Sequence, residues 1–201
     1  MAKPNVKLMC WNVRGLNAPA HRDTVRDLIR DYNATIVCLQ ETKLDHVDDT
    51  LIESILGPSF TASYHVLPVV GSRGGMIMAV SDAYFRLSDF QATLGSISAT
   101  VTMLVDCVDW TLSCVYGPQG EQDKLLFINK LRGLKYLVKP RWLILGDFNL
   151  ITKAADKNNL NINNRLIGSF RSALNHLQLK EMRLSGCKFT WSNAQENPVL
   201  T

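Results

Sequence analysis

Short, almost continuous apolar runs are the feature that most restricts how this chain folds. Residues 34–39 form one such run and residues 142–145 form another. Runs of this kind are typical of strands whose sheet is covered on both faces. We therefore expect a layered fold, with further elements packed against both sides of a sheet.

Amphipathic stretches lie between the apolar runs. In the first of them, one helical face carries Val25, Leu28, Ile29 and Tyr32. The second begins with Asp48 and Asp49, which favour a helix N-terminus through the helix dipole. Helices are predicted over residues 20–32, 48–56, 121–137 and 168–177.

Further strands are predicted from alternation and from turn residues. Residues 97–105 mostly alternate apolar and polar side chains, the period of a half-buried strand, and a short acidic connection predicts an antiparallel hairpin with residues 110–116. The remaining predicted strands are residues 6–13, 76–80 and 189–192. Together these elements favour one α/β domain over residues 1–201 with two packed sheets.

Composition excludes several classes of protein. No apolar stretch is long enough to span a membrane. The net charge of +4 permits contact with nucleic acid without requiring it. The cysteine count is odd, no pair has CxxC spacing and no secretory segment is seen, so we expect reduced thiols in a nuclear or cytoplasmic protein. Each thiol is expected to be a small buried hydrophobe: Cys10, Cys38, Cys107, Cys114 and Cys187.

Polar residues follow or end four of the predicted strands, and they are the candidates for chemistry. They are Asn12, Glu41, Tyr116, and the pair Asp147 and Asn149. In α/β sheets, ligands gather beyond such strand ends. We therefore expect these side chains, distant in sequence, to share one cleft.

This set of side chains suits metal-assisted attack on a phosphate. Glu41 is a natural oxygen ligand for a hard divalent ion, and Asp147 can orient or deprotonate the attacking water. Asn12 and Asn149 can hold a phosphate oxygen or a catalytic side chain, and Tyr116 can donate a hydrogen bond to the phosphate. Each residue also has a structural explanation, because Asp and Asn often only build turns and a Glu at a strand end is commonly solvated.

Three motifs resemble, in order, those of the endonuclease/exonuclease/phosphatase superfamily, which includes the apurinic endonucleases and deoxyribonuclease I. They are residues 10–16 (CWNVRGL), 39–43 (LQETK) and 145–149 (LGDFN). Three later stretches are similar to the endonuclease domains of LINE-type (non-LTR) retrotransposons, especially those of plants: residues 115–118, 163–171 and 189–193.

The resemblance implies a four-layer α/β/β/α sandwich that nicks one strand of DNA with Mg²⁺, with Mn²⁺ as an alternative, and leaves a 3′-hydroxyl. It implies Glu41 as a metal ligand and Asp147 as the residue that handles the nucleophilic water. Asn12 and Asn149 would position metal-bound water and phosphate, with Asn12 close to the metal. Tyr116 would contact the phosphate. Trp191 is expected to pack in the core.

The sequence departs from the family pattern in two places. Arg14 stands where apurinic endonucleases have an Asp near the metal. LINE-type members often lack that Asp too. The family pattern continues with Arg-x-Asp and Ser-Asp-His segments, whereas this sequence ends at Thr201. We therefore expect a C-terminally incomplete fold with little or no activity. The four histidines are expected on surface faces or loops: His21, His46, His65 and His176.

Two other functions stay open at this stage. One is a non-catalytic retrotransposon remnant with at most weak affinity for nucleic acid. Salt-dependent DNA binding without cleavage would favour it. The other is a phosphatase of the same fold, which would release phosphate from small substrates. The sequence does not determine the oligomeric state.

Overall fold

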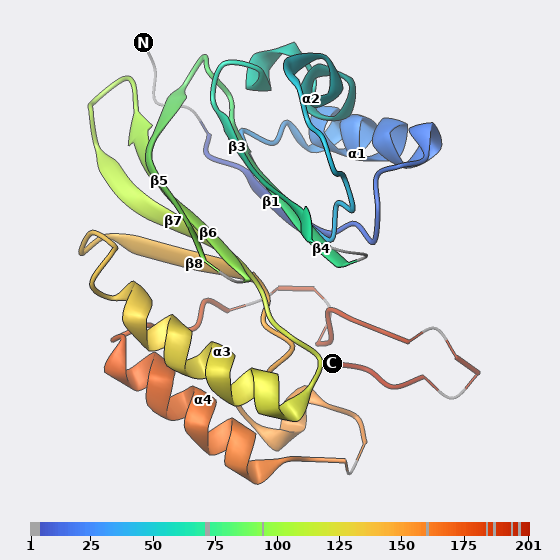
Figure 1. The fold of residues 1–201 in the computed structure, drawn as a ribbon, viewed down its shortest axis with the longest axis vertical. Helices are drawn as coiled ribbons and strands as arrows, with labels where there is room; N and C mark the ends of the chain where they lie inside the picture. Colours follow the sequence, from blue (N-terminus) through green and yellow to red (C-terminus); the bar gives the residue numbers. More distant parts are fainter. Residues whose placement is uncertain are drawn as a thin grey trace. The chain divides into compact units, whose positions relative to one another are not determined.

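The computed structural model describes residues 5–70, 73–93, 95–159, 161–183, 185–186, 188–193, 195–196 and 198–201 (Figure 1). The chain forms two compact units. The first comprises Met1–Tyr116 and Val138–Asp147, and the second comprises Gly117–Leu137 and Phe148–Thr201. Within the described residues, no helix is both long and apolar enough to cross a bilayer.

A four-stranded mixed sheet, sheet A, opens the first unit. Its strand order is β1 (Leu8–Asn12), β2 (Ile36–Gln40), β4 (Arg73–Val80) and β3 (Tyr64–Val70), with β1 and β2 parallel and the other neighbours antiparallel. Helices α1 (Pro19–Tyr32) and α2 (Asp49–Leu56) cover one face, followed by the short 3-10 helix η1 (Pro58–Phe60) (Figure 1). Buried Val25 and Ile52 from the helices share this core with Leu39 from β2.

A second mixed sheet, sheet B, packs against the other face of sheet A. Its order is β5 (Phe85–Thr93), β6 (Ser96–Met103), β7 (Asp109–Tyr116) and β8 (Trp142–Asp147), with β7 and β8 parallel. Cys38 and Met78 of sheet A lie in one buried cluster with Leu112 of sheet B. The α/β prediction with two packed sheets is therefore confirmed, and β6 and β7 form the predicted antiparallel hairpin.

The second unit contains α3 (Glu121–Leu134), the 3-10 helix η2 (Ala154–Asp156) and α4 (Asn164–His176). The two α-helices run side by side in the same direction (Figure 1). Near their N-termini Asn163 Nδ2 donates to Glu121 Oε1 at 2.8 Å, and near their C-termini Lys135 Nζ donates to the carbonyl of His176 at 3.2 Å. Helix α4 begins earlier than predicted because Asn163 caps it by accepting from Leu166 N.

Two strands escaped the sequence prediction, for identifiable reasons. Strand β3 contains Pro68, which cannot donate to a ladder and is tolerated because β3 is an edge strand. Strand β5 is rich in polar residues and has a register shift between Ser88 and Gln91, with Asp89 at a φ of 52°. Both features obscure the period of two that identifies a strand.

Strand β6 also differs from its prediction, because it is buried on both faces. Ser98 and Thr100 are buried together with the apolar residues that alternate with them. The hydroxyl of Ser98 is 2.7 Å from that of Ser113, which also accepts from the Trp142 indole at 2.9 Å. Pairing among side chains allows this polar face to be buried.

Several predictions about single segments are wrong. Tyr32 is exposed, because α1 buries only Val25 and Ile29. Helix α3 ends at Leu134, three residues before the predicted end at residue 137. Residues 189–192 form no strand but only an isolated bridge between Ser192 and Leu200. Trp191 in that segment is 43% exposed and does not pack in the core.

Candidate active site

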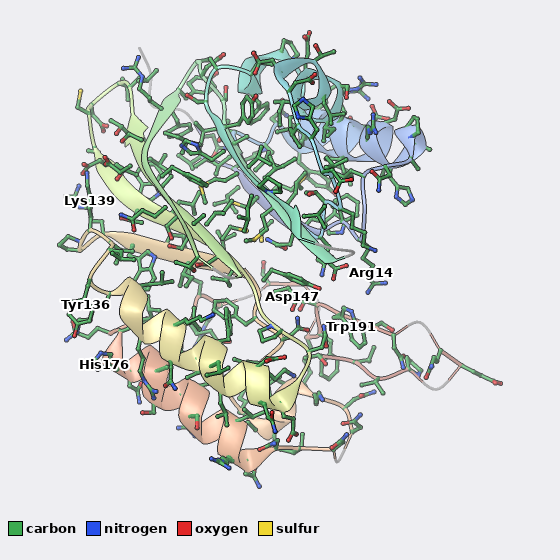
Figure 2. All side chains as sticks on the ribbon, in the orientation of Figure 1. Arg14, Tyr136, Lys139, Asp147, His176 and Trp191 are labelled. Atoms are coloured by element: carbon green, nitrogen blue, oxygen red, sulfur yellow. The ribbon has the colours of Figure 1, made fainter. Side chains whose placement is uncertain are left out.

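Four of the five predicted residues meet at one end of the first unit. Asn12 is the last residue of β1, Glu41 directly follows β2, and Tyr116 and Asp147 end β7 and β8. Both strand pairs are parallel, and their registers place Asn12 beside Gln40 and Tyr116 beside Asp147. The carboxyl ends of four strands therefore lie together, and Figure 2 shows Asp147 and Arg14 at this end.

Asn12 connects the two carboxylates of the site. Its Nδ2 donates to Glu41 Oε1 at 3.0 Å and to Asp147 Oδ2 at 3.1 Å. The two carboxylate oxygens are therefore no further apart than the sum of those distances. Its Oδ1 accepts from the backbone N–H of Arg14 at 3.3 Å, which fixes the orientation of the amide. A neutral donor thus holds two acids together where a third acid would add repulsion.

Tyr116 orients Glu41 from the opposite sheet. Its hydroxyl donates to Glu41 Oε1 at 2.5 Å, so this oxygen takes hydrogen bonds from both Tyr116 and Asn12. Within the described residues, Glu41 Oε2 has no hydrogen bond or ion pair. One carboxylate oxygen is therefore fixed while the other is available to a ligand.

The environment keeps Glu41 ionised. Burial alone would raise its pKa, but hydrogen bonds from Tyr116 and Asn12 and the charges of Lys43 and Arg14 outweigh burial and lower the pKa. An ionised carboxylate is the form that binds a cation. The site is therefore ready to hold a metal ion at neutral pH without a proton first leaving Glu41.

The loops after β1 and β2 are bound to each other. Val13 N donates to the carbonyl of Gln40 at 3.0 Å, and Leu16 N donates to that of Thr42 at 2.8 Å. Gly75 supports the same loop from β4, since a Cβ there would lie 2.5 Å from the Thr42 hydroxyl. Residues that carry the chemistry are thus held by backbone hydrogen bonds and close packing.

Gly146 places Asp147. Its φ is +132°, and a Cβ at this position would lie 2.0 Å from the carbonyl oxygen of Val115 on the neighbouring strand. Only glycine permits this conformation and this close approach of β8 to β7. The Gly-Asp pair in the third motif therefore has a steric reason.

Gln40 and a group of thiols lie behind the site. The buried Gln40 amide donates to the sulfur of Cys10 at 3.0 Å and to that of Cys114 at 2.9 Å. The hydrogen bond with Cys114 raises the pKa of the Cys10 thiol, so this thiol stays protonated although Cys10 as a residue is exposed. The Cys10 thiol is therefore not suited to act as a nucleophile or metal ligand.

The expectation that every cysteine is buried is correct for some of them and wrong for others. Cys38 and Cys114 are buried, whereas Cys10, on the edge strand β1, and Cys107 are exposed. Cys187 lies outside the described residues.

Asn149 belongs to the second unit and is described within it. Its φ is 51°, its Nδ2 donates to the carbonyl of Gly117 at 2.7 Å, and its Oδ1 accepts from Gln119 at 2.9 Å. These bonds join the starts of the two segments that make up the second unit, Gly117–Leu137 and Phe148–Thr201. The predicted role of Asn149 toward phosphate stays a prediction.

The donor set fits a hard divalent cation. Among the described residues, no group of three or more His, Cys, Asp or Glu side chains is arranged to hold a metal ion. Mg²⁺ does not require one, since it keeps several waters and binds through one or two carboxylates plus substrate phosphates. Glu41 and Asp147 supply that number of carboxylates.

The histidines lie elsewhere in the fold. His21, His46 and His176 are exposed, as expected. His65 is not on a loop but in β3, half-buried and stacked on Phe90 with ring centroids 4.3 Å apart. Burial lowers the pKa of His65, which favours the neutral ring.

Arg14, Lys43 and Gln40 were not among the predicted site residues. Gln40 had a visible signal, because it is a polar residue at the end of an apolar strand. Arg14 and Lys43 lie inside the motifs, yet only the fold shows that their charges act on Glu41.

Comparison with known proteins agrees with this geometry. Residues 9–199 match the model of a family described as the endonuclease/exonuclease/phosphatase family. A comparison with curated protein sequences finds no significant match.

Solved structures show the same fold at low sequence identity. An AP endonuclease from Archaeoglobus fulgidus aligns with a TM-score of 0.62 and 18% identity, over 84% of this chain and 68% of the archaeal one. The endonuclease domain of TRAS1, a telomere-specific non-LTR retrotransposon, gives 0.60 and 13%, over 87% and 73%. TDP2 from D. rerio, complexed with a single-strand DNA product, gives 0.59 and 13%, over 96% and 79%.

Proposed function

Because this chain belongs to the endonuclease/exonuclease/phosphatase family, we propose that its strand-end site is that of a magnesium-dependent phosphodiesterase that nicks DNA. The observation that supports this most directly is the bridge from Asn12 to both Glu41 and Asp147. It gathers two hard anionic ligands and leaves one Glu41 oxygen without a partner within the described residues.

We assign the metal to Glu41, with Asn12 beside it. A bound Mg²⁺ would neutralise charge that develops on the phosphoryl oxygens. The Asn12 amide now directs its nitrogen to the carboxylates, so ligation by its oxygen would require the amide to turn. Without that turn, Asn12 keeps the two acids at a fixed separation.

We assign proton handling to Asp147, which would accept a proton from the attacking water. Tyr116 and Asn149 would contact the phosphate. The hydrogen bond from Tyr116 to Glu41 gives it a positioning role as well. Since Tyr116 is neutral, it does not repel the phosphodiester.

DNA is the proposed substrate, and a LINE-type retrotransposon domain is the proposed kind of enzyme. Two structural relatives support this: one is the endonuclease domain of a non-LTR retrotransposon, and the other is a protein complexed with a single-strand DNA product. The motifs at residues 115–118 and 163–171 support the same assignment, including the resemblance to plant elements.

Plasmid nicking tests the proposal. Supercoiled plasmid would be incubated with protein in excess and Mg²⁺ or Mn²⁺, so that slow turnover is detected. We expect relaxed circles that stop forming in EDTA and that carry a 3′-hydroxyl able to prime a DNA polymerase. Glu41→Gln keeps the shape of the side chain and removes its charge, so it should lower the rate roughly a hundredfold or more.

The matched control is Glu53→Gln, an exposed change on α2 that should leave the rate unchanged. Equal nicking by the Glu41→Gln variant would contradict the proposal, as would nicking that persists in EDTA. Release of inorganic phosphate from small phosphomonoesters, without nicking, would instead identify a phosphatase.

A further inference from the structure

Two cations, Arg14 and Lys43, stand beside the carboxylates of the site. Arg14 lies two residues after β1, and Lys43 lies two residues after Glu41. Within the described part of the chain, neither side chain makes an ion pair or hydrogen bond. They lie in the loops that directly follow β1 and β2, the strands that lead into Asn12 and Glu41. The backbone therefore places both cations beside the acids without direct contact between the charged groups.

The two cations belong to one rigid loop pair. Leu16 N donates to the carbonyl of Thr42, and Asn17 Nδ2 donates to that of Lys43 at 3.1 Å. The Lys43 stem lies over Gly15, because a Cβ on that glycine would be 3.4 Å from Lys43 Cδ. The backbone positions of both cations are therefore set relative to each other and to Glu41.

The backbone at both positions is unfavourable for residues that carry a Cβ. Arg14 and Lys43 have φ values of 54° and 55°, in the left-handed region that glycine and asparagine adopt more readily. Strained residues at a functional site point to a use for their side chains. Here the sequence has charged residues where glycine or asparagine would adopt the backbone conformation more easily.

We propose that Arg14 and Lys43 form an anion-binding pair that holds phosphate oxygens of a nucleic-acid strand beside Glu41 and Asp147. This rests on the proposed function and adds the residues that attract its substrate. Two acids alone would repel a phosphodiester, whereas two cations balance their charge. Arg14 can hold two oxygens with its planar fork, and Lys43 adds a point charge.

Binding without metal provides the first test. Affinity for a short fluorescein-labelled DNA duplex would be measured by anisotropy in EDTA over a range of salt concentrations. Arg14→Gln and Lys43→Gln should each weaken binding roughly threefold to tenfold and reduce the slope of log affinity against log salt by about one. Arg86→Gln, an exposed change of equal charge on β5, should change neither.

Metal binding provides the second test and separates a charge effect from a folding defect. Removing a positive charge near Glu41 should tighten the binding of Mn²⁺ roughly threefold in titration calorimetry. A damaged site would weaken the binding of both DNA and Mn²⁺. The anion-binding pair instead predicts weaker binding of DNA and tighter binding of Mn²⁺. Arg14→Lys keeps the charge and loses the planar fork, so it should retain the salt slope and lose only part of the DNA affinity.

The inference would be overturned if Arg14→Gln and Lys43→Gln both left the salt slope of DNA binding unchanged. It would also be overturned if Arg86→Gln lost as much DNA affinity as they do. The outcome is independent of catalysis, because both measurements are equilibria. If plasmid is nicked and the slopes do not change, only the inference fails. If the slopes change and no nicking is seen, the anion-binding pair stands and the proposed function fails.

Discussion

The two units of this molecule differ in charge. The first unit contains eleven Lys and Arg against thirteen Asp and Glu, a formal charge of −2, whereas the second contains eleven against five, a formal charge of +6. The net charge of +4 for the whole chain conceals this difference. The acids of the strand-end site lie in one unit, and the excess positive charge, which would attract a polyanion, is in the other. Arg14 and Lys43 are the local exception within the acidic unit.

The units differ in packing as well. The first has two buried clusters, with residues such as Val37 and Leu112 fully inaccessible. Almost all of the largest fully buried side chains lie in the first unit, and Ile128 is the one from the second among those described. Both units leave some large apolar side chains in solvent, such as Tyr32 at 63% in the first and Leu126 at 60% and Tyr136 at 82% in the second. Figure 2 labels Tyr136 and Trp191 among them. Tight packing around the acids means that small steric changes there should have large effects, while the second unit should tolerate them.

A pair of glycine substitutions tests this contrast and should give the largest effect on stability. Gly146→Ala forces a Cβ against the Val115 carbonyl at a φ of +132°, and should destabilise the first unit by roughly 3 kcal/mol or more. Gly133→Ala lies in α3 with open space around it, and should stabilise the second unit by about 0.5–1 kcal/mol. Urea unfolding, with hydrogen exchange to assign the change to a unit, measures both.

The contrast would fail if the two substitutions had similar effects. It would also fail if exchange protection in Gly146→Ala were lost in the second unit while β7 and β8 stayed protected.

The charge difference predicts an effect on DNA affinity of about one order of magnitude. The test changes three exposed cations of the second unit to Gln: Lys180, Arg183 and Lys188. The triple change should weaken duplex binding roughly tenfold and reduce the slope of log affinity against log salt by up to about three. The measurement is anisotropy in EDTA at several salt concentrations.

The control removes three exposed cations of the first unit: Arg26, Arg30 and Arg86. Two of these already face carboxylates, since Arg26 is 2.7 Å from Asp23 and Arg30 is 2.9 Å from Asp27. Their charges are partly compensated, so their loss should matter less. Equal weakening by both triple variants would show that affinity follows total charge and not its distribution.

The sequence predicted where the site would form better than how its parts contact each other. Apolar strands that end in Asn12, Glu41 and Asp147 show that polar groups gather at one edge, because parallel neighbours end together. The bond from Tyr116 to Glu41 joins different sheets, and no local pattern encodes how two sheets pack. The buried hydroxyls of β6 look like a solvated face for the same reason, since only the fold supplies their partners.

Tyr116→Phe should give the smallest effect and tests whether the first unit tunes its own acid. The phenol hydrogen bond is one of the interactions that lower the pKa of Glu41, so its removal should raise that pKa. Because a depressed carboxyl pKa means that the function is lost as pH falls through it, the acid limb of Mn²⁺ binding should move to higher pH. At neutral pH, where Glu41 is ionised in both proteins, affinity should fall only a few-fold. Tyr84→Phe, an exposed change in the same unit, should leave the acid limb of Mn²⁺ binding in place. If Tyr116→Phe also leaves that limb in place, Asn12 and the two cations suffice to keep Glu41 ionised.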